Sequence, residues 1–270
     1  MNKQGNTYTF IYSIVLVVVV AAILAIVSLS LKPYQDENIE NEKRQNILSS
    51  VNVSSTPETS AELFNKIITK QFILNYKGEA IEGNAFAVDI PTEGKKLQKA
   101  LKNPELQQAL KDGKLLSETI KDDKALADVK FPVFVADIDG AIKYILPTYG
   151  VGLWGPVWGY ISLNEDKNTV YGVLFDHKGE TPGLGAEITQ PFFQKQFSGK
   201  TIFENSTLKA ITVKKGGNAT GAHEVDAISG GTITSKGVET MIGDYLKCYE
   251  QFLKQIQYCA KKKHYFHLRT

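Results

Sequence analysis

The fold class follows from the stretch Phe131-Pro-Val-Phe-Val-Ala-Asp-Ile-Asp-Gly-Ala-Ile-Lys-Tyr-Ile-Leu146. It holds two runs rich in β-branched and aromatic residues, separated by Asp139-Gly140. Asp-Gly between such runs is typical of a hairpin turn, because both residues tolerate positive φ. The stretch therefore predicts two antiparallel strands joined by a tight turn.

More β structure and a long helix are predicted on the C-terminal side of this hairpin. Val157–Leu163 and Thr169–Phe175, with a polar turn between them, predict a second hairpin. Thr207–Lys214 is another β-rich run. From Thr234 to Tyr258 the apolar residues recur at helical spacing and form one broad face, which predicts a long helix.

Helices are predicted on the N-terminal side. Ser55 and Glu58 have the spacing of a capping box, and apolar residues at helical spacing follow from Leu63 to Phe72. A weaker helical pattern covers residues 93–120. Because the hairpins are grouped apart from the helices and do not alternate with them, we expect an α+β fold.

One segment is long and apolar enough to cross a membrane. Phe10 to Leu31 contains no charged residue, and at about 1.5 Å per residue its roughly 22 residues match the ~30 Å hydrocarbon core. The run is longer than the apolar part of a usual cleaved signal peptide, so we expect a retained anchor; cleavage near Ser28–Ser30 is the alternative. Lys3 and Lys32 flank it almost evenly, so the flanking charges leave its orientation open.

Composition bounds the remaining possibilities. The 270 residues carry 31 basic and 29 acidic side chains, a net charge of +2, which gives no support to nucleic-acid binding. The two cysteines exclude a disulfide scaffold or an all-cysteine iron–sulfur or zinc site.

We expect these segments: a short tail (1–9), the transmembrane anchor (10–31), a polar linker (32–54), a helical or mixed first part of the soluble body (55–130), a β-rich domain (131–258) and a basic tail (259–270).

Two glycine-rich loops are candidates for ligand contact. Gly150-Val-Gly-Leu-Trp-Gly155 matches the glycine string of dinucleotide-binding folds, but a strand-like run follows where that motif needs a helix. It is therefore interpreted as a loop between strands or, because Trp154 and Trp158 are the only two tryptophans and lie four residues apart, as a wall for a flat ligand. Glu180-Thr-Pro-Gly-Leu-Gly185 predicts a type II turn at Pro182-Gly183. This second loop is either a plain turn before a helix-like run at 186–197 or a place where backbone N–H groups approach a ligand.

Asp226-Ala-Ile-Ser-Gly-Gly-Thr-Ile-Thr-Ser235 is the most informative motif, because it stands directly before the long C-terminal helix. A helix N-terminus has about four free N–H donors and about half a positive charge, which suits a phosphate group. A cap rich in Ser and Thr would have the same composition. Composition alone leaves both interpretations open.

Catalytic side chains and a metal site are not predicted. No nucleophile–base pair stands out in the sequence. Among the four histidines only His264 and His267 are close enough in sequence to bind one metal ion together, and both lie in the basic tail. We therefore expect neither a catalytic residue nor a bound metal.

Three motifs in a fixed order carry a resemblance to a known family. Gly152-Leu-Trp-Gly155, then His177-Lys-Gly-Glu-Thr-Pro-Gly-Leu-Gly185, then Asp226-Ala-Ile-Ser-Gly-Gly-Thr232, all after one membrane helix, resemble the C subunit of the sodium-translocating NADH:quinone reductase. The likeness covers nearly the whole chain and is strongest over about 140–245, the FMN-binding domain, so 131–258 is the expected FMN-binding domain. The related G subunit of the Rnf electron-transport complex is the alternative.

The resemblance implies a covalent flavin. In this family FMN is joined by a phosphoester bond to the threonine that closes a Ser-Gly-Ala-Thr motif, and Thr232 has that position here; Gly231 replaces the usual alanine. A separate flavin transferase attaches FMN from FAD, which fits the missing catalytic base. The other expected FMN contacts lie in the same motifs: Trp154, Thr181, Gly183, Leu184, Gly185, Ser229, Gly230, Gly231 and Thr234.

The resemblance also implies a role and a place. The chain would pass single electrons within a complex that oxidises NADH, reduces a ubiquinone-type quinone and pumps sodium ions, and it would not be catalytic alone. Its partners would be the other subunits of that complex. The family's orientation implies a single pass through the bacterial inner membrane, with the soluble body in the periplasm. The alternative from a different functional class is a membrane-anchored domain without redox activity, which binds a ligand or scaffolds partners.

Overall fold

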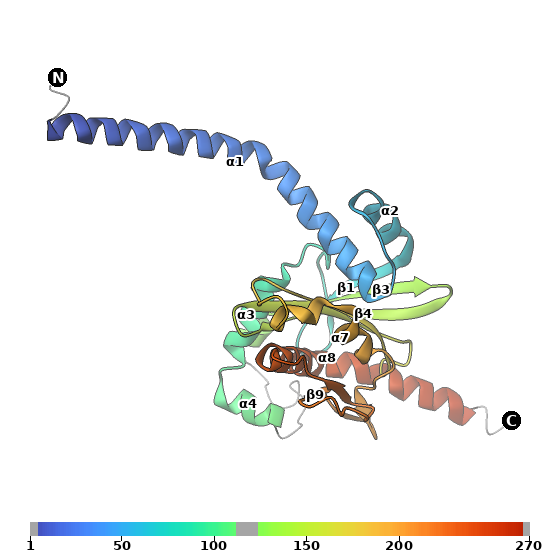
Figure 1. Cartoon of the computed structure of the whole chain (residues 1–270). Helices are drawn as coiled ribbons and strands as arrows, with labels where there is room; N and C mark the ends of the chain where they lie inside the picture. Colours follow the sequence, from blue (N-terminus) through green and yellow to red (C-terminus); the bar gives the residue numbers. More distant parts are fainter. Residues whose placement is uncertain (1–4, 112–123, 267–270) are drawn as a thin grey trace. The chain divides into compact units, whose positions relative to one another are not determined.

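A six-stranded antiparallel sheet forms the centre of the soluble part in the computed structural model, which describes residues 5–111 and 124–266 (Figure 1). The strand order is β2-β1-β3-β4-β5-β6, and the described residues also form two small two-stranded sheets, β7-β8 and β9-β10. The strands are β1 (Ile68–Leu74), β2 (Ala80–Ile81), β3 (Phe131–Ile138), β4 (Ala141–Val151), β5 (Pro156–Leu163), β6 (Val170–His177), β7 (Phe203–Glu204), β8 (Thr207–Leu208), β9 (Thr212–Lys214) and β10 (Glu224–Asp226).

Both predicted hairpins are present. β3 pairs with β4 through Ile138 and Ala141, and the turn residues Asp139 and Gly140 have φ of 52° and 84°. β5 pairs with β6 in the second hairpin. The class is α+β, as the grouping of the sequence patterns predicted.

Helices cover both faces of the sheet. The helices of the described residues are α1 (Asn6–Ser50), α2 (Pro57–Ile67), α3 (Ile90–Ala100), α4 (Pro104–Lys111), α6 (Lys124–Ala127), α7 (Pro191–Gln194) and α8 (Thr232–Phe266), with the 3₁₀ turns η1 (Gly185–Thr189) and η2 (Lys195–Phe197). On β3, Phe131 packs edge-on against Tyr249 of α8, whereas Phe134 packs against Phe64 of α2. Alternate residues of a strand point to opposite faces, so β3 is buried from both sides, and its first six residues are all buried.

The predicted C-terminal helix corresponds to α8, which begins two residues earlier and runs further than expected. Its buried face includes Val238, Ile242, Leu246 and Leu253. The Tyr249 hydroxyl donates a hydrogen bond to the Pro132 carbonyl oxygen at 2.8 Å, which ties the helix to β3. Burying this apolar face against the sheet accounts for the helix more than intrinsic propensity does.

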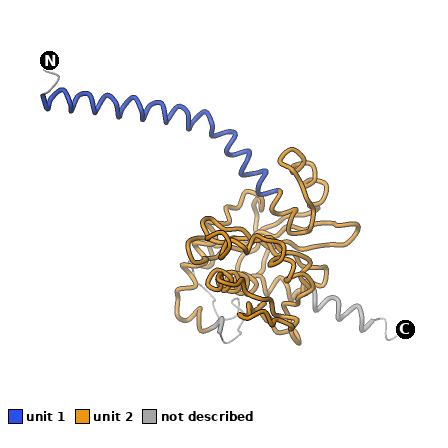
Figure 2. Tube along the Cα trace, viewed as in Figure 1, with its two compact units in different colours: residues 1–44 blue, residues 45–270 orange. Residues whose placement is uncertain are grey.

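The polar segment 32–54, expected as a linker, is helical over most of its length, because α1 continues as helix to Ser50. The ion pairs Lys32–Asp36 and Glu40–Arg44 bridge one helical turn in this polar part. The chain divides into two compact units, residues 1–44 and 45–270 (Figure 2), so the last turn of α1 belongs to the second unit. Ile47 and Leu48 are fully buried there, and this burial stabilises the last turn of the helix.

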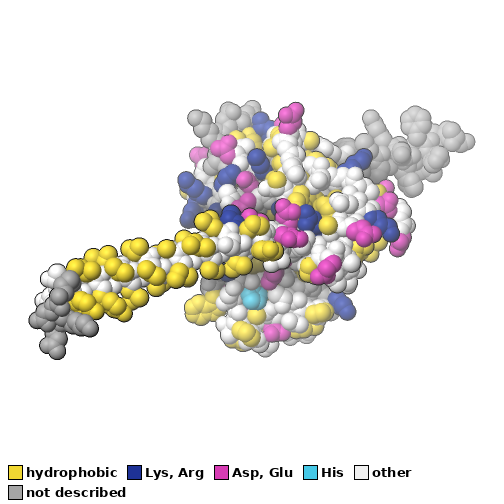
Figure 3. Space-filling model, turned by 90° about the horizontal axis from the view of Figure 1, so that it is seen from above, with side chains coloured by type: hydrophobic (Ala, Val, Ile, Leu, Met, Phe, Trp, Pro, Cys, Tyr) yellow, Lys and Arg dark blue, Asp and Glu magenta, His cyan; other side chains and the backbone are white. Residues whose placement is uncertain are grey.

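The first unit has the surface of a membrane helix. Hydrophobic side chains cover α1 over the apolar run (Figure 3), and none of its most apolar window is buried within the chain. By length and composition α1 is able to cross a membrane. This fits a single-pass membrane protein.

The segment 55–130 differs from expectation at its start. Thr56, not Ser55, caps α2, and the helix ends at Ile67. Ile68 and Phe72, expected on this helix, lie on β1, which pairs with β3. The backbone hydrogen bonds to β3 and the burial of Ile73 and Leu74 outweigh the helical spacing. Residues 55–130 and 131–258 therefore share one sheet.

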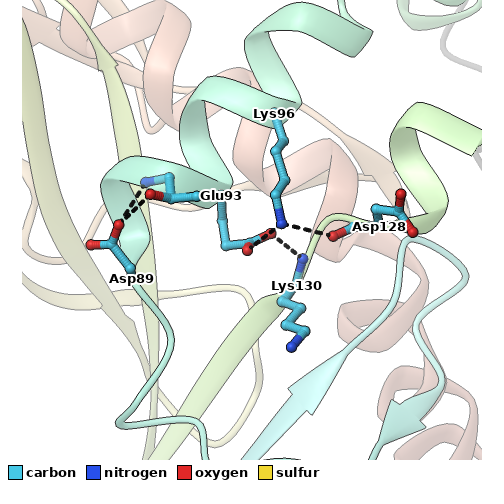
Figure 4. A network of polar contacts seen from close by, with 6 residues as sticks. Asp89, Glu93, Lys96, Asp128 and Lys130 are labelled. Atoms are coloured by element: carbon cyan, nitrogen blue, oxygen red, sulfur yellow. Dashed lines mark hydrogen bonds and ion pairs between the residues drawn. The ribbon is translucent and has the colours of Figure 1, made fainter.

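The helical pattern at 93–120 corresponds to α3 and α4, and its part from 112 onward lies outside the described residues. A polar network joins α3 to the start of β3 (Figure 4). The buried Glu93 carboxylate accepts from the Lys130 backbone N–H at 2.9 Å and from the Lys96 ammonium at 2.8 Å. Lys96 also donates to the Asp128 carbonyl oxygen. This network satisfies a carboxylate that burial would otherwise destabilise.

Candidate functional site

Three loops meet at one cavity of about 270 Å³. They are the β4–β5 turn, the loop between β6 and η1, and the segment that leads into α8. These loops contain the three motifs that the sequence singled out. The cavity is lined by Leu153, Trp154, Glu180, Thr181, Leu184, Gly185, Gly230, Gly231, Thr232, Ile233 and Thr234.

The β4–β5 turn presents Trp154. Val151 pairs with Pro156 at the end of the two strands, and the Gly152 N–H donates to the Gly155 carbonyl oxygen at 2.8 Å. A strand follows the glycines, so the dinucleotide-binding interpretation of this string is excluded, as its sequence context predicted. Trp154 stands at the tip of the turn with 69% of its surface exposed, which leaves its indole free to pack against a ligand.

The second loop is the predicted tight turn. The Leu184 N–H donates to the Thr181 carbonyl oxygen at 3.1 Å, and Gly183 has φ of 76°, which a side chain would strain. The Gly183 N–H donates to the Glu187 carboxylate. Gly183 itself does not line the cavity. The run 186–197, expected to be helix-like, forms the three short pieces η1, α7 and η2, because Pro191 interrupts its backbone hydrogen bonding.

The third loop ends at the N-terminus of α8. Gly231 is the residue before the helix, and its carbonyl oxygen accepts from the Ser235 N–H at 2.9 Å. The first turn contains no acidic residue, so the positive end of the helix dipole is not neutralised from within the helix. The N-terminus lines the cavity through Thr232, Ile233 and Thr234 and brings the positive end of the helix dipole to this wall, next to the Glu180 carboxylate.

The four hydroxyl groups around this helix start have different environments. The Ser235 hydroxyl is buried and donates to the Gly231 carbonyl oxygen at 2.8 Å. The Thr234 hydroxyl is buried and donates to the Glu180 carboxylate at 2.5 Å. Thr232 is half-buried in the cavity wall, and its hydroxyl makes no hydrogen bond to a described residue. Ser229 is exposed and lies outside the cavity lining.

Eight of the ten predicted site residues line the cavity together: Trp154, Thr181, Leu184, Gly185, Gly230, Gly231, Thr232 and Thr234. Gly183 and Ser229 lie in the same loops but outside the lining. Sequence reasoning missed Leu153, Glu180 and Ile233. Leu153 and Ile233 are large and mostly exposed beside motif residues, and this unusual exposure is visible only in the structure.

Glu180 is the most informative of the missed residues. Its side chain is buried, and its carboxylate accepts hydrogen bonds from the Trp154 backbone N–H at 2.8 Å and from the Thr234 hydroxyl. Its own N–H donates to Nδ1 of His177 at 3.2 Å. The only sequence signal was its place at the start of a turn motif.

Other groups in the described residues give no competing redox or metal site. Cys248 is free and buried on α8, and burial raises the pKa of its thiol, which makes it unreactive. No cluster of three metal-ligating side chains is found in the described residues. A larger hollow of about 490 Å³ lies between α3, α4, β4 and α8, but no predicted site residue lines it.

Comparison with known proteins assigns the class of this site. Residues 152–247 match the FMN-binding domain family, and this range contains all three loops. The fold is thus that of an FMN-binding-domain protein.

Individual relatives narrow the assignment. The C subunit of the Na(+)-translocating NADH-quinone reductase of Vibrio vulnificus strain YJ016 is 33% identical over 224 residues, which cover 82% of this chain and 83% of the relative. The C subunit of the Pasteurella multocida reductase is 32% identical over 259 residues, 95% and 96% of the two chains. The crystal structure of the C subunit from Parabacteroides distasonis superimposes with a TM-score of 0.67 at 42% identity and covers 83% of this chain and 96% of that one. The chain belongs to the family of Na(+)-translocating NADH-quinone reductase C subunits.

Proposed function

We propose that this chain is the flavoprotein C subunit of a sodium-translocating NADH:quinone reductase, with FMN joined to Thr232 by a phosphoester bond. Within the complex it passes single electrons on the way from NADH to a ubiquinone-type quinone. The proposal is supported by the family match over 152–247 and by the relatives' names. The observation that carries the attachment site is the Thr232 hydroxyl, because Thr232 lines the cavity and its hydroxyl has no partner among the described residues.

The residues around the cavity fit a flavin phosphate. The N-terminus of α8 supplies backbone N–H donors and a positive dipole for the phosphate charge that remains after esterification. Trp154, Leu153, Leu184 and Ile233 supply an apolar rim for a flat ring system. The flavin itself supplies the redox chemistry; these residues hold and orient it.

Attachment requires no catalytic base from this chain. A flavin transferase uses FAD as donor: the Thr232 oxygen–phosphorus bond forms, the pyrophosphate bond of FAD breaks, AMP leaves, and the hydroxyl proton is released. The structure supports Thr232 over Thr234 as the acceptor because the Thr234 hydroxyl is buried and bonded to Glu180. The transferase therefore meets one accessible threonine in the first turn of α8.

The place of the protein in the cell is proposed from the same family. α1 is the proposed single-pass anchor in the bacterial inner membrane, with residues 45–270 in the periplasm. A periplasm-active reporter enzyme fused after residue 270 tests this orientation. High reporter activity is the expected result. Activity only from a cytoplasmic reporter would contradict the proposed orientation.

The attachment is tested by co-expressing the chain with a flavin transferase and recording flavin fluorescence of the denatured protein band. Wild-type chain is expected to give a fluorescent band, and Thr232→Val to lose essentially all of it. Thr234→Ser, which keeps a hydroxyl for Glu180, is the matched control and is expected to stay fluorescent. A fluorescent Thr232→Val band would place the bond on another residue, and a dark wild-type band would remove the covalent cofactor.

A further inference from the structure

The Glu180 carboxylate is a buried junction between the three loops of the cavity. Only 5% of the residue is exposed. One carboxylate oxygen accepts from the Trp154 N–H on the β4–β5 turn, and the other accepts from the Thr234 hydroxyl on α8. Among the described residues no lysine, arginine or histidine forms an ion pair with it. A buried carboxylate without a counter-ion is costly, so its retention requires a reason.

Two glycines of the motifs are explained by this carboxylate. A Cβ atom at Gly152 would lie 2.5 Å from one Glu180 oxygen, and a Cβ atom at Gly185 would overlap the other. The backbone of both loops therefore packs directly onto the carboxylate. Any side chain at either position would push Glu180 away from Trp154 and Thr234.

We infer that Glu180 is a positioning residue of the flavin site, which holds Trp154 and the first turn of α8 around the cavity and places a fixed negative charge beside the cofactor. This inference rests on the proposed function. By accepting from Thr234, Glu180 keeps that hydroxyl buried and leaves Thr232 as the accessible acceptor. By accepting from the Trp154 N–H, it fixes the turn that carries the indole.

The charge has a separate consequence. Glu180 lines the cavity, where the surroundings are of low polarity and a charge acts more strongly than in water. Reduction adds electrons to the flavin, and a neighbouring negative charge opposes that addition. Glu180 therefore lowers the midpoint potential of FMN relative to the same site with a neutral side chain.

The test measures the midpoint potential of the bound flavin by spectroelectrochemical titration of the flavinylated full-length chain. Glu180→Gln keeps the size of the side chain and removes the charge, so a more positive midpoint potential is expected. Thr234→Val removes one hydrogen bond and keeps the charge, so no positive shift is expected. Glu93→Gln, at a buried carboxylate outside the cavity, is the matched control; it is expected to lose stability without changing the potential.

The outcomes separate the inference from the proposed function. An unchanged potential in Glu180→Gln, or equal shifts in Glu180→Gln and Thr234→Val, would overturn the charge role. Peptide mapping by mass spectrometry provides a second readout: Glu180→Ala is expected to lose flavin at Thr232 or to distribute it onto Thr234, and full modification confined to Thr232 would overturn the positioning role. A wild-type chain without covalent flavin would instead refute the proposed function.

Discussion

α1 and α8 are both long helices rich in apolar residues, but different interactions maintain them. Along α1 the apolar side chains from Phe10 to Leu31 are exposed in the chain itself, whereas α8 buries one face against the sheet. α1 is apolar on every side over this run, so it needs lipid as its surroundings. α8 has a polar side and needs a protein partner. Composition alone therefore predicts the surroundings of α1, whereas the surroundings of α8 depend on the segments that it packs against.

The largest expected effect contrasts one leucine from each helix. Leu246→Ala removes a fully buried side chain of α8 and is expected to lower the free energy of unfolding of the soluble unit by about 2–5 kcal/mol. Leu24→Ala, on the exposed apolar surface of α1, is expected to change it by less than about 0.5 kcal/mol. Urea unfolding in detergent measures both. Equal losses would show that α1 also depends on packing within the chain.

The next effect concerns a buried lysine that contacts α8. The Lys167 ammonium donates to the Phe252 carbonyl oxygen at 3.2 Å and lies 3.3 Å from the centre of the Phe252 ring. Burial lowers the pKa of Lys167 from 10.5 to about 8. The unfolded chain therefore binds more protons than the folded chain between pH 8 and 10.5, so this group makes stability rise with pH across that window.

Lys167→Met is expected to remove this part of the rise, which amounts to about 3 kcal/mol. Unfolding free energies measured across the same pH window for wild type and variant test it. Lys32→Met is the matched control, because Lys32 is exposed on α1 and pairs with Asp36 at the surface. A steep rise retained in Lys167→Met would assign the pH dependence to other groups.

The smallest effect concerns the residue before α8. A Cβ atom at Gly231 would lie 2.9 Å from the Leu184 carbonyl oxygen, so an alanine there has to displace the second loop slightly. Gly231→Ala is expected to cost about 1 kcal/mol and to keep flavin on Thr232. Thermal unfolding and band fluorescence measure the two results. A loss of flavin would show that the attachment needs glycine here.

Sequence patterns predicted the hairpins and the cavity loops because these depend on local chemistry. Asp139-Gly140 forms its turn from its own φ preferences, and Gly183 does the same. Ile68 and Phe72 were assigned to a helix because their spacing is helical, but pairing with a distant strand, β3, decides their conformation. Such long-range hydrogen bonding has no local signal.

In the site, too, local features were predictable from sequence and long-range contacts were not. The motifs named eight of the residues around the cavity, because glycine-rich turns and a hydroxyl-rich helix start are recognisable in sequence. Glu180 was missed because its role depends on Trp154 and Thr234, which reach it from other loops. Its distance from Thr234 in the sequence is 54 residues, and only folding brings the two together.

The sequence by itself determined a helix long and apolar enough to cross a membrane and the α+β class, because composition and local backbone preference are sufficient for each. Thr232 was singled out only through the resemblance of its motif to a known family. Only the tertiary structure decided that α1 continues as helix to Ser50, that β1 joins β3, and that Thr234 is bonded to Glu180 while Thr232 lines the cavity. The physical reason is that burial and hydrogen bonding between distant segments depend on which groups meet when the chain folds. These contacts distinguish Thr232 from Thr234, which the sequence alone does not separate.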